Sequence, residues 1–243
     1  MANAEVVLLE NLRHWKEEKE NDKKFAKHLA SFADVYVNEA FSSSHREHAS
    51  IVGVPKYIKG YAGDLFVQEV ENLKKVSSPK KPFLFVLGGA KFSTKIPLLN
   101  KFLKKADRVV VAGALMNNFY KEKGYEVGDS VVEDGDFKIK KMLKNKNLYI
   151  PRDVVVHNKK ENAEMKKPTK VLKGEVIMDV GQDALEDIQK YIKESKFILW
   201  NGPLGNYEKG YDEGTKELAH RIAESSKDSI IGGGDTVSIV SKL

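Results

Sequence analysis

The sequence predicts an α/β protein of doubly wound parallel sheets, divided into two parts near residue 80. From about residue 80 onward, short β-branched or aromatic runs alternate with stretches whose apolar residues recur at helical spacing, as in strand–helix–strand units. Several of the strand runs end directly in glycine-rich turns. With 243 residues, 41% of them apolar, the chain can bury a sizeable core, which excludes a disordered protein.

The part before residue 80 contains too few elements to fold alone. Residues 6–9 and residues 35–37 are apolar runs that we expect to be buried strands. Between them, Phe25, Leu29 and Phe32 fall on one face of a helix.

A connecting helix is expected next, because apolar residues between positions 62 and 73 recur at i, i+3 and i+4. The sequence SSPKKP at residues 77–82 then ends the helical pattern. We therefore expect an incomplete first domain at residues 1–60, an interdomain helix and linker at residues 61–79, and a nearly complete second domain at residues 80–243.

The second part supplies the repeated strand–helix units. Strands are expected at residues 83–87, 108–112, 148–150, 176–179, 197–200 and 229–231. Helices are expected at about residues 94–104, 115–123, 136–144, 184–194, 214–225 and from residue 236 onward. The many lysines of residues 138–146 are interpreted as a solvated helix face rather than a nucleic-acid site.

Charge and composition narrow the class of protein. Lys and Arg total 41 against 35 Asp and Glu, and the net charge of +6 favours anionic partners such as phosphorylated metabolites, nucleic acid or acidic membranes. The absence of cysteine excludes thiolate metal sites and cysteine nucleophiles and suits a reducing compartment, so a cytoplasmic location is expected. Apolar stretches such as residues 83–90 are far shorter than the ~18–20 residues of a membrane span, and no signal-peptide pattern is present.

Small-residue turns follow four of the expected strands. They are GGAK at residues 88–91, AGA at residues 112–114, NGPLG at residues 201–205 and GGGDT at residues 232–236. Such turns let backbone amides approach phosphate groups, and the carboxyl ends of parallel strands are where ligands bind. Helix packing explains any single turn equally well, but four in one sheet favour a nucleotide-sized anionic ligand.

The standard nucleotide fingerprints do not occur, since no turn has the P-loop or the full dinucleotide glycine spacing. Lys91 and Lys95 lie four apart at a helix start, where both can meet phosphate oxygens or simply face solvent. Asp235 can cap a helix or hold Mg²⁺ beside phosphates. Glu208 can accept ribose hydroxyls or can be an ordinary exposed loop glutamate.

A second anion site is expected in the first part. Arg13 follows the first strand run, and His45, Arg46 and His48 follow the second, so these strand ends can clamp one small anion. The histidine spacing matches no zinc motif and a third ligand is missing, which argues against metal chelation.

With these residues in view, the sequence resembles the phosphoglycerate kinase family over essentially its whole length. The resemblance rests on the collinear motifs LLENLR (8–13), VYVNEAF (35–41), HREHAS (45–50), GGAK (88–91), WNGPLG (200–205) with Glu208, and GGGDT (232–236). It implies a two-domain hinge kinase that moves a phosphoryl group between 1,3-bisphosphoglycerate and ADP, giving 3-phosphoglycerate and ATP. The first domain would bind the phosphoglycerate and the second Mg²⁺ with ADP or ATP.

The resemblance also implies roles for individual residues. Arg13, His45, Arg46 and His48 would bind the phosphoglycerate, while Lys91 and Gly234 would be catalytic. The nucleotide would be bound by Lys95, Gly88, Gly89, Gly113, Asn201, Glu208, Gly232, Gly233, Asp235 and Thr236, with Asp235 holding Mg²⁺. Small-molecule substrates, a monomer, and no nucleic-acid or membrane partner are expected.

Some family features are missing from this sequence. The early Asp-Phe-Asn and Ser-His-Leu-Gly-Arg-Pro motifs and the late Thr-Gly-Gly-Gly turn do not occur, so we expect a truncated chain that is inactive alone. Thr94 replaces the usual Asp, Ala114 replaces a frequent Gly, and three serines at residues 42–44 replace Gly-Thr-Ala. Thr94 removes one metal-side carboxylate, and Ala114 is expected to tighten the adenine slot.

Three other classes of protein share some of these sequence features. A non-catalytic nucleotide-binding module of the same fold would bind Mg-ADP without turnover. A basic nucleic-acid-binding protein would need stacking aromatics along a basic groove, whereas the aromatics here fall in expected strands and core faces. A dinucleotide-dependent dehydrogenase is disfavoured by the glycine spacing.

Overall fold

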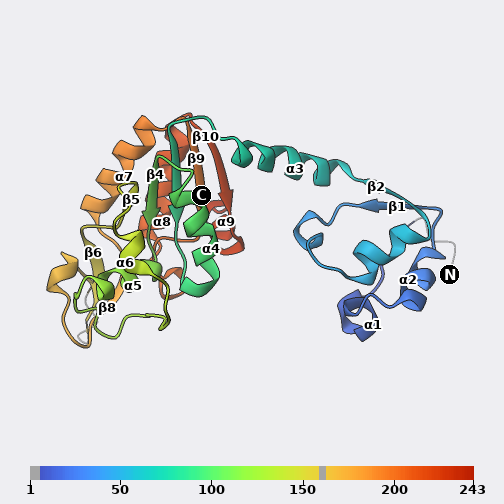
Figure 1. Cartoon of the computed structure of the whole chain (residues 1–243), viewed down its shortest axis with the longest axis horizontal. Helices are drawn as coiled ribbons and strands as arrows, with labels where there is room; N and C mark the ends of the chain where they lie inside the picture. The colour runs from blue at the N-terminus through green and yellow to red at the C-terminus, as the bar shows by residue number, and fades with distance from the viewer. Residues whose placement is uncertain (1–5, 159–162) are drawn as a thin grey trace. The chain divides into compact units, whose positions relative to one another are not determined.

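The computed structural model describes residues 6–158 and 163–243. The chain separates into two compact units, one ending at Ser78 and the other spanning Pro79–Leu243 (Figure 1).

The first unit contains a parallel pair of strands and three helices among the described residues. Its elements are α1 (Lys16–Lys19), α2 (Lys23–Ala30), β1 (Val35–Asn38), β2 (Lys59–Ala62) and α3 (Asp64–Ser77), with single turns at Leu12–His14, Phe41–Ser43, Ala49–Gly53 and Val54–Lys56. Asp22 begins α2, because its Oδ1 accepts hydrogen bonds from the amides of Lys24 (2.9 Å) and Phe25 (2.8 Å). The helix buries Ala26 and Ala30, while Phe32 lies beyond its end and is exposed.

Two expectations for this unit are wrong. Residues 6–9 form no strand, and their side chains are exposed. Strand β1 exists, but Val35 and Val37 are 50% and 53% exposed instead of buried. The physical reason is the same for both segments: the sheet of this unit has only β1 and β2 among the described residues, so no layer covers these apolar side chains.

Helix α3 shows the same exposure. Glu39 fixes its start, because the Glu39 carboxylate accepts the amide of Phe66 (3.0 Å), and the ring of Phe66 packs against Phe41. None of the residues of α3 is buried, and Leu65 is 62% exposed. The helical spacing therefore predicts the helix correctly, but its apolar stripe has no covering layer within the unit.

The second unit is built on a five-stranded parallel sheet in the order β10-β9-β3-β4-β5. The strands are β3 (Phe83–Leu87), β4 (Arg108–Val111), β5 (Leu148–Tyr149), β9 (Phe197–Asn201) and β10 (Asp228–Gly232). The predicted α/β class and its parallel sheet are confirmed.

Helices cover both faces of this sheet. They are α4 (Phe92–Leu103), α5 (Leu115–Glu122), α6 (Ile139–Met142), α7 (Gln182–Glu194), α8 (Glu213–Glu224) and α9 (Gly234–Val240). On one face Phe83 and Phe85 pack against Phe102 of α4, with ring centroids 5.6 and 4.3 Å apart. On the other face, alternate residues of the same strands join one buried cluster with Ile188 of α7 and Leu218 of α8.

A second, antiparallel sheet corrects the expected topology. Residues 176–179 do form a strand, β8 (Val176–Val180), but it pairs with β6 (Val154–His157), which also pairs with β7 (Ala163–Lys166). An apolar run does not specify which strand it will pair with. Here β8 forms its backbone hydrogen bonds with an antiparallel neighbour outside the main sheet. Buried Glu175 lies just before β8, and its Oε1 accepts a hydrogen bond from Nζ of Lys166 on β7 (2.8 Å). This contact joins the two outer strands of the sheet.

The helix expected at residues 136–144 is also shorter than predicted. Only Ile139–Met142 is helical. Lys138 adopts a left-handed conformation (φ 55°), so the helix cannot begin before Ile139. Ile139 and Met142 are its buried residues, so one turn suffices to bury the apolar side chains of the segment.

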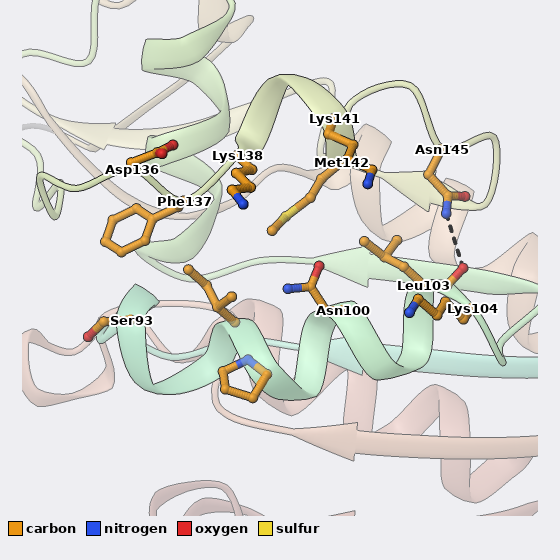
Figure 2. A pocket seen from close by; sticks show the side chains of 12 residues that line it. Ser93, Asn100, Leu103, Lys104, Asp136, Phe137, Lys138, Lys141, Met142 and Asn145 are labelled. Atoms are coloured by element: carbon orange, nitrogen blue, oxygen red, sulfur yellow. Dashed lines mark hydrogen bonds between the residues drawn. The ribbon is translucent and has the colours of Figure 1, made fainter.

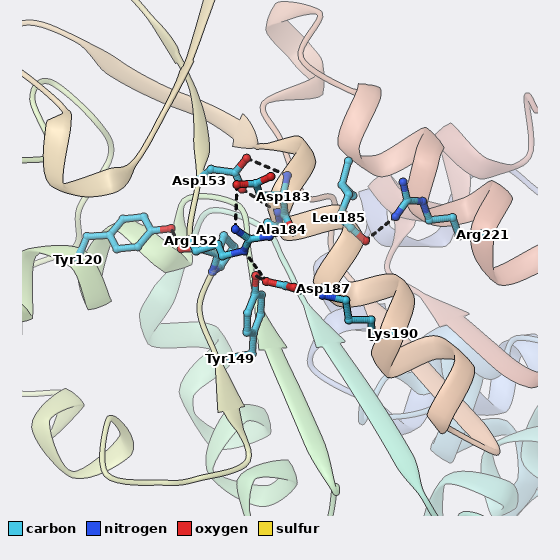
Figure 3. Close-up of polar contacts among 11 residues, drawn as sticks. Tyr120, Tyr149, Arg152, Asp153, Asp183, Ala184, Leu185, Asp187, Lys190 and Arg221 are labelled. Carbon is cyan, nitrogen blue, oxygen red and sulfur yellow. Dashed lines mark hydrogen bonds and ion pairs between the residues drawn. The ribbon is translucent and has the colours of Figure 1, made fainter.

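A polar network ties the end of the main sheet to α7 (Figure 3). Both oxygens of Asp153 accept the first amides of α7, from Asp183 (2.9 Å) and Ala184 (2.7 Å). Arg152 donates to Asp183 (2.9 Å) and to Asp187 (2.7 Å), and the Tyr149 hydroxyl donates to Asp187 (3.0 Å). Since α7 directly follows β8, this network fixes the position of β8 beside the main sheet.

Candidate active site

The strand register brings the four small-residue turns to one edge of the main sheet. Leu87 of β3 lies opposite both Val111 of β4 and Asn201 of β9, and Gly232 of β10 lies opposite Asn201. The four strands therefore end at the same level, and the turns that follow them are neighbours.

The turns pack against one another through their backbones. The amide of Gly88 donates to the Asn201 carbonyl (2.8 Å), and the amide of Gly89 donates to the Pro203 carbonyl (3.0 Å). Gly113 has φ +60°, and a Cβ on it would lie 2.7 Å from the backbone nitrogen of Gly89. Glycine is required at position 113 by both its conformation and this close approach.

A pocket of about 320 Å³ lies against these turns. All four turns contribute to its lining, including the predicted residues Gly89, Gly113 and Asp235, and predicted Glu208 lines it as well. Strand β8 of the antiparallel sheet adds an apolar wall through Val176, Ile177 and Met178. The pocket thus combines an apolar wall with polar groups from the turns, as small-molecule sites do.

A lysine lies within the same group of turns. Lys95 of α4 donates from Nζ to the Asn201 Oδ1 at 2.6 Å, which brings these two predicted residues together. A Cβ on Gly232 or Gly233 would lie within 3.4 Å of the side-chain nitrogen Nδ2 of Asn201. The glycine turn therefore lies next to the Lys95–Asn201 pair. Fully buried Thr236 accepts the Gly202 amide through its hydroxyl (2.9 Å) and joins the last turn to the NGPLG turn.

Asp235 is the carboxylate that could hold a metal ion here. The hydroxyl of Tyr207 hydrogen-bonds to it, and this hydrogen bond raises the pKa of Tyr207. Within residues 6–158 and 163–243, no group of three or more His, Cys, Asp or Glu side chains could hold a metal ion. One carboxylate suits Mg²⁺, which commonly takes one or two protein carboxylates together with phosphate and water oxygens. Thr94 offers no carboxylate, and its hydroxyl donates to the Lys91 carbonyl (2.9 Å).

Lys91 and Gly234 lie at helix starts. Lys91 is exposed and immediately precedes α4, while Gly234 is the first residue of α9. Glu133 contacts the start of α4, where its Oε2 accepts the Ser93 amide at 3.0 Å. Hydrogen bonds from Ser93, with a smaller contribution from the charge of Lys91, lower the pKa of Glu133. Sequence patterns do not indicate Glu133, because its partner Ser93 lies 40 residues away in the sequence.

Asp179 and Asn117 are two further polar residues that the sequence analysis missed. Asp179, on β8, accepts the Gly214 amide (3.0 Å) at the start of α8, and burial raises its pKa to about 7. Asn117, on α5, lines the pocket and donates to the Val131 carbonyl (3.0 Å), while its Oδ1 is buried with no partner among the described residues. Neither residue belongs to a recognisable motif.

The four anion-binding candidates of the first unit are only partly grouped. Arg13 donates from Nη2 to the hydroxyl of Ser43 (2.7 Å), which lies just before His45 and Arg46. His45 and Arg46 are exposed. His48 is half-buried, and its Nδ1 lies 3.6 Å from a carboxylate oxygen of the buried Glu18.

A parallel sheet with a pocket at its carboxyl edge, walled by small-residue turns and accompanied by a lysine and a carboxylate, is the arrangement of α/β proteins that bind phosphorylated ligands. The phosphoglycerate kinase family model matches residues 1–243. The chain belongs to the phosphoglycerate kinase family.

Individual relatives agree with this assignment. The chain is similar to phosphoglycerate kinase of Dictyoglomus turgidum, with 41% identity over 255 residues that cover 100% of this chain and 64% of that protein. It is 39% identical to the cytosolic phosphoglycerate kinase of Nicotiana tabacum, over 98% of this chain and 63% of that one. The solved phosphoglycerate kinase from Coxiella burnetii matches with a TM-score of 0.83 and 38% identity, covering 96% of this chain and 63% of that chain. The chain therefore spans less than two thirds of the length of these relatives.

Among the described residues, no helix is long and apolar enough to span a membrane.

Proposed function

We propose that the chain contributes the nucleotide-binding site, and part of the 3-phosphoglycerate-binding site, of a phosphoglycerate kinase. The reaction is the reversible phosphoryl transfer from 1,3-bisphosphoglycerate to ADP, which gives 3-phosphoglycerate and ATP. The observation that carries the proposal is that residues of all four small-residue turns line a single pocket. Membership of the family supplies the reaction and disfavours a non-catalytic module of the same fold.

The base and ribose of the nucleotide occupy this pocket in the proposal. The adenine lies between the turn at Gly113 and Ala114 and the apolar wall of β8, where its flat faces are desolvated. Glu208 accepts the ribose hydroxyls. Ala114 narrows the slot relative to a glycine by one methyl group, which shortens the distance available to the ring.

The phosphates extend toward Lys95, Asn201 and the glycine turn before α9. The Lys95 ammonium group neutralises phosphate charge, and glycines 232 and 233 leave the phosphates room to approach the backbone. Mg²⁺, held by Asp235, supplies further charge neutralisation when it is bound. Lys91 and the backbone of Gly234 would stabilise the phosphoryl group in transfer, because its loose transition state requires positive charge and positioning more than covalent chemistry.

The phosphoglycerate side is proposed for the first unit. Arg13 and Arg46 would bind the phosphate and carboxylate of 3-phosphoglycerate as guanidinium forks, with His45 and His48 beside them. The contact of Arg13 with Ser43 supports this proposal, since it holds one guanidinium next to the segment that carries the other. Glu18 would orient His48 through its carboxylate.

Other expectations remain predictions. A cytosolic location agrees with the name of the Nicotiana relative, whereas another relative is named chloroplastic. A monomer without nucleic-acid or membrane partners stays a prediction.

Calorimetric titration of the chain with Mg-ADP tests the proposed site. We expect saturable binding that Lys95→Ala and Glu208→Ala each weaken by about tenfold or more, because each loses a charge-assisted hydrogen bond. Lys101→Ala is the matched control: this lysine is also on α4, but it lies over the Phe102 ring and outside the pocket lining. NAD should bind more weakly than ADP.

Two outcomes would contradict the proposal. One is a wild-type chain that is folded by circular dichroism and binds no Mg-ADP. The other is equal binding by the wild type and both site variants, which would place the nucleotide elsewhere.

A further inference from the structure

A second cavity, larger than the nucleotide pocket, lies on the other side of the α4 start. It measures about 610 Å³ and forms a groove between α4 and the segment 136–145 (Figure 2). None of its lining residues lines the nucleotide pocket. The segment opposite α4 forms only the single turn α6.

Three lysines contribute to the groove against one acid. Lys104 directly follows α4, and Lys138 and Lys141 come from the opposite segment, while Asp136 is the acidic residue of the lining. Figure 2 shows the ammonium groups of Lys138 and Lys141 directed from their segment toward α4. Within the described parts of the chain, none of these three lysines forms an ion pair. Like charges that face the same space repel one another, and a bound anion relieves this repulsion.

The groove also offers neutral hydrogen bonding and apolar surface. The Asn100 amide extends from α4 toward the lysine-bearing segment (Figure 2) and makes no side-chain hydrogen bond with described residues. Phe137 lies at one end of the groove and Leu103 at the other (Figure 2), and Ile96 and Met142 also line it. The volume lies in the range of small-molecule sites, and the mixture of apolar walls with a few convergent polar groups is typical of them.

We propose that this groove is a binding site for an amphipathic organic anion, a phosphate or carboxylate group joined to an aromatic or branched aliphatic body. The anionic group would contact Lys138, Lys141 and Asn100, and the body would lie against Phe137 and neighbouring apolar residues. The Ser93 end of the groove adjoins the start of α4, so a ligand here lies beside the helix that carries Lys95. The proposal is independent of the function of the nucleotide pocket.

Methionine methyl NMR provides a test that separates the two cavities in one spectrum. Met142 lines the groove, Met116 and Met178 line the nucleotide pocket, and Met165 is an exposed residue of β7. Phenyl phosphate is the probe, and inorganic phosphate and phenol represent its two parts. We expect phenyl phosphate to shift the Met142 signal saturably and to bind with an affinity at least about tenfold higher than that of either part alone. Mg-ADP should shift the signals of Met116 and Met178 instead.

Charge reversal identifies the lysines that carry the site. The double variant Lys138→Glu/Lys141→Glu should weaken phenyl phosphate binding by at least about tenfold. The double variant Lys140→Glu/Lys144→Glu is the matched control, because it makes the same change in net charge in the same segment and neither lysine lines the groove.

Three results would overturn the proposal. The first is a Met142 signal that phenyl phosphate leaves unchanged up to the solubility limit. The second is inorganic phosphate binding as tightly as phenyl phosphate, which would leave the apolar walls without a role. The third is equal weakening by the control and the Lys138→Glu/Lys141→Glu variant, which would indicate only a general effect of net charge.

Discussion

The buried carboxyl group of Asp179 should make the second unit less stable as pH rises, and Asp179→Asn should remove this dependence. Burial raises the pKa of Asp179 from 3.8 to about 7, and the charges of Asp212 and Glu213 add to the effect. The native state therefore keeps a proton in a pH range where the unfolded chain has released it. Unfolding becomes more favourable as pH rises from about 4 through 7.

The two pKa values set the size of the effect. Between pH 5 and pH 8 the unfolded carboxyl is ionised throughout, whereas the native carboxyl changes from neutral to mostly ionised. The contribution of Asp179 to the free energy of unfolding should fall by about 3 kcal/mol over this interval. Asparagine has no such proton, so the variant should gain relative stability by the same amount as pH rises.

Urea unfolding followed by Trp200 fluorescence measures this difference. Trp200 is fully buried in β9, and a Trp15→Phe background removes the other tryptophan, which belongs to the first unit. The other titrating groups are common to both proteins, so their effects cancel when wild type and variant are compared at each pH. Free energies that run parallel for the two proteins from pH 5 to pH 8 would refute the reasoning.

Three further substitutions probe the core, the polar network and the turns. Phe85→Ala should lower the free energy of unfolding by about 3–5 kcal/mol, because a fully buried ring is lost from the central strand, and a loss below about 1 kcal/mol in urea unfolding would contradict this. Asp153→Ala should cost about 1–2 kcal/mol, since both oxygens cap α7, and thermal unfolding that matches the wild type would argue against it. Gly113→Ala should weaken Mg-ADP binding by at least about tenfold more than Gly210→Ala. Both positions have positive φ, but only a Cβ at position 113 would meet the Gly89 backbone. Equal affinities of the two variants in calorimetry would contradict the close packing of the turns.

The strands of the main sheet are predictable from sequence because their signal is local. Residues 83–87 are five apolar residues between a proline and a glycine, and they form β3 with the same bounds. The turns that follow are also local signals, and the rule that parallel strands carry ligands at their carboxyl ends predicts that the turns meet. The convergence of Gly89, Gly113 and Asp235 on one pocket follows from these two facts.

Features that depend on distant partners could not be predicted in this way. Asp179 is an unremarkable strand residue until Gly214, 35 positions later, packs against it. The apolar run that forms β8 gives no indication that its neighbours are antiparallel. Residues 6–9 have the composition of a buried strand, but composition cannot supply the second layer that burial requires.

The strand order also has a consequence for how the second unit assembles during synthesis. The central strand β3 pairs with β4 on one side and with β9 on the other, and more than 100 residues separate Phe83 from its partner Phe197. One edge of the growing sheet therefore stays open while the antiparallel sheet and α7 are made, a period in which unpaired backbone can associate with other chains. The NGPLG turn follows β9, and the GGGDT turn follows β10, which comes after the other four strands of the main sheet in the sequence. The pocket is therefore complete only after β10 and its turn have been made, and a nascent chain released before β10 would carry the lysine of α4 and three of the turns without Asp235.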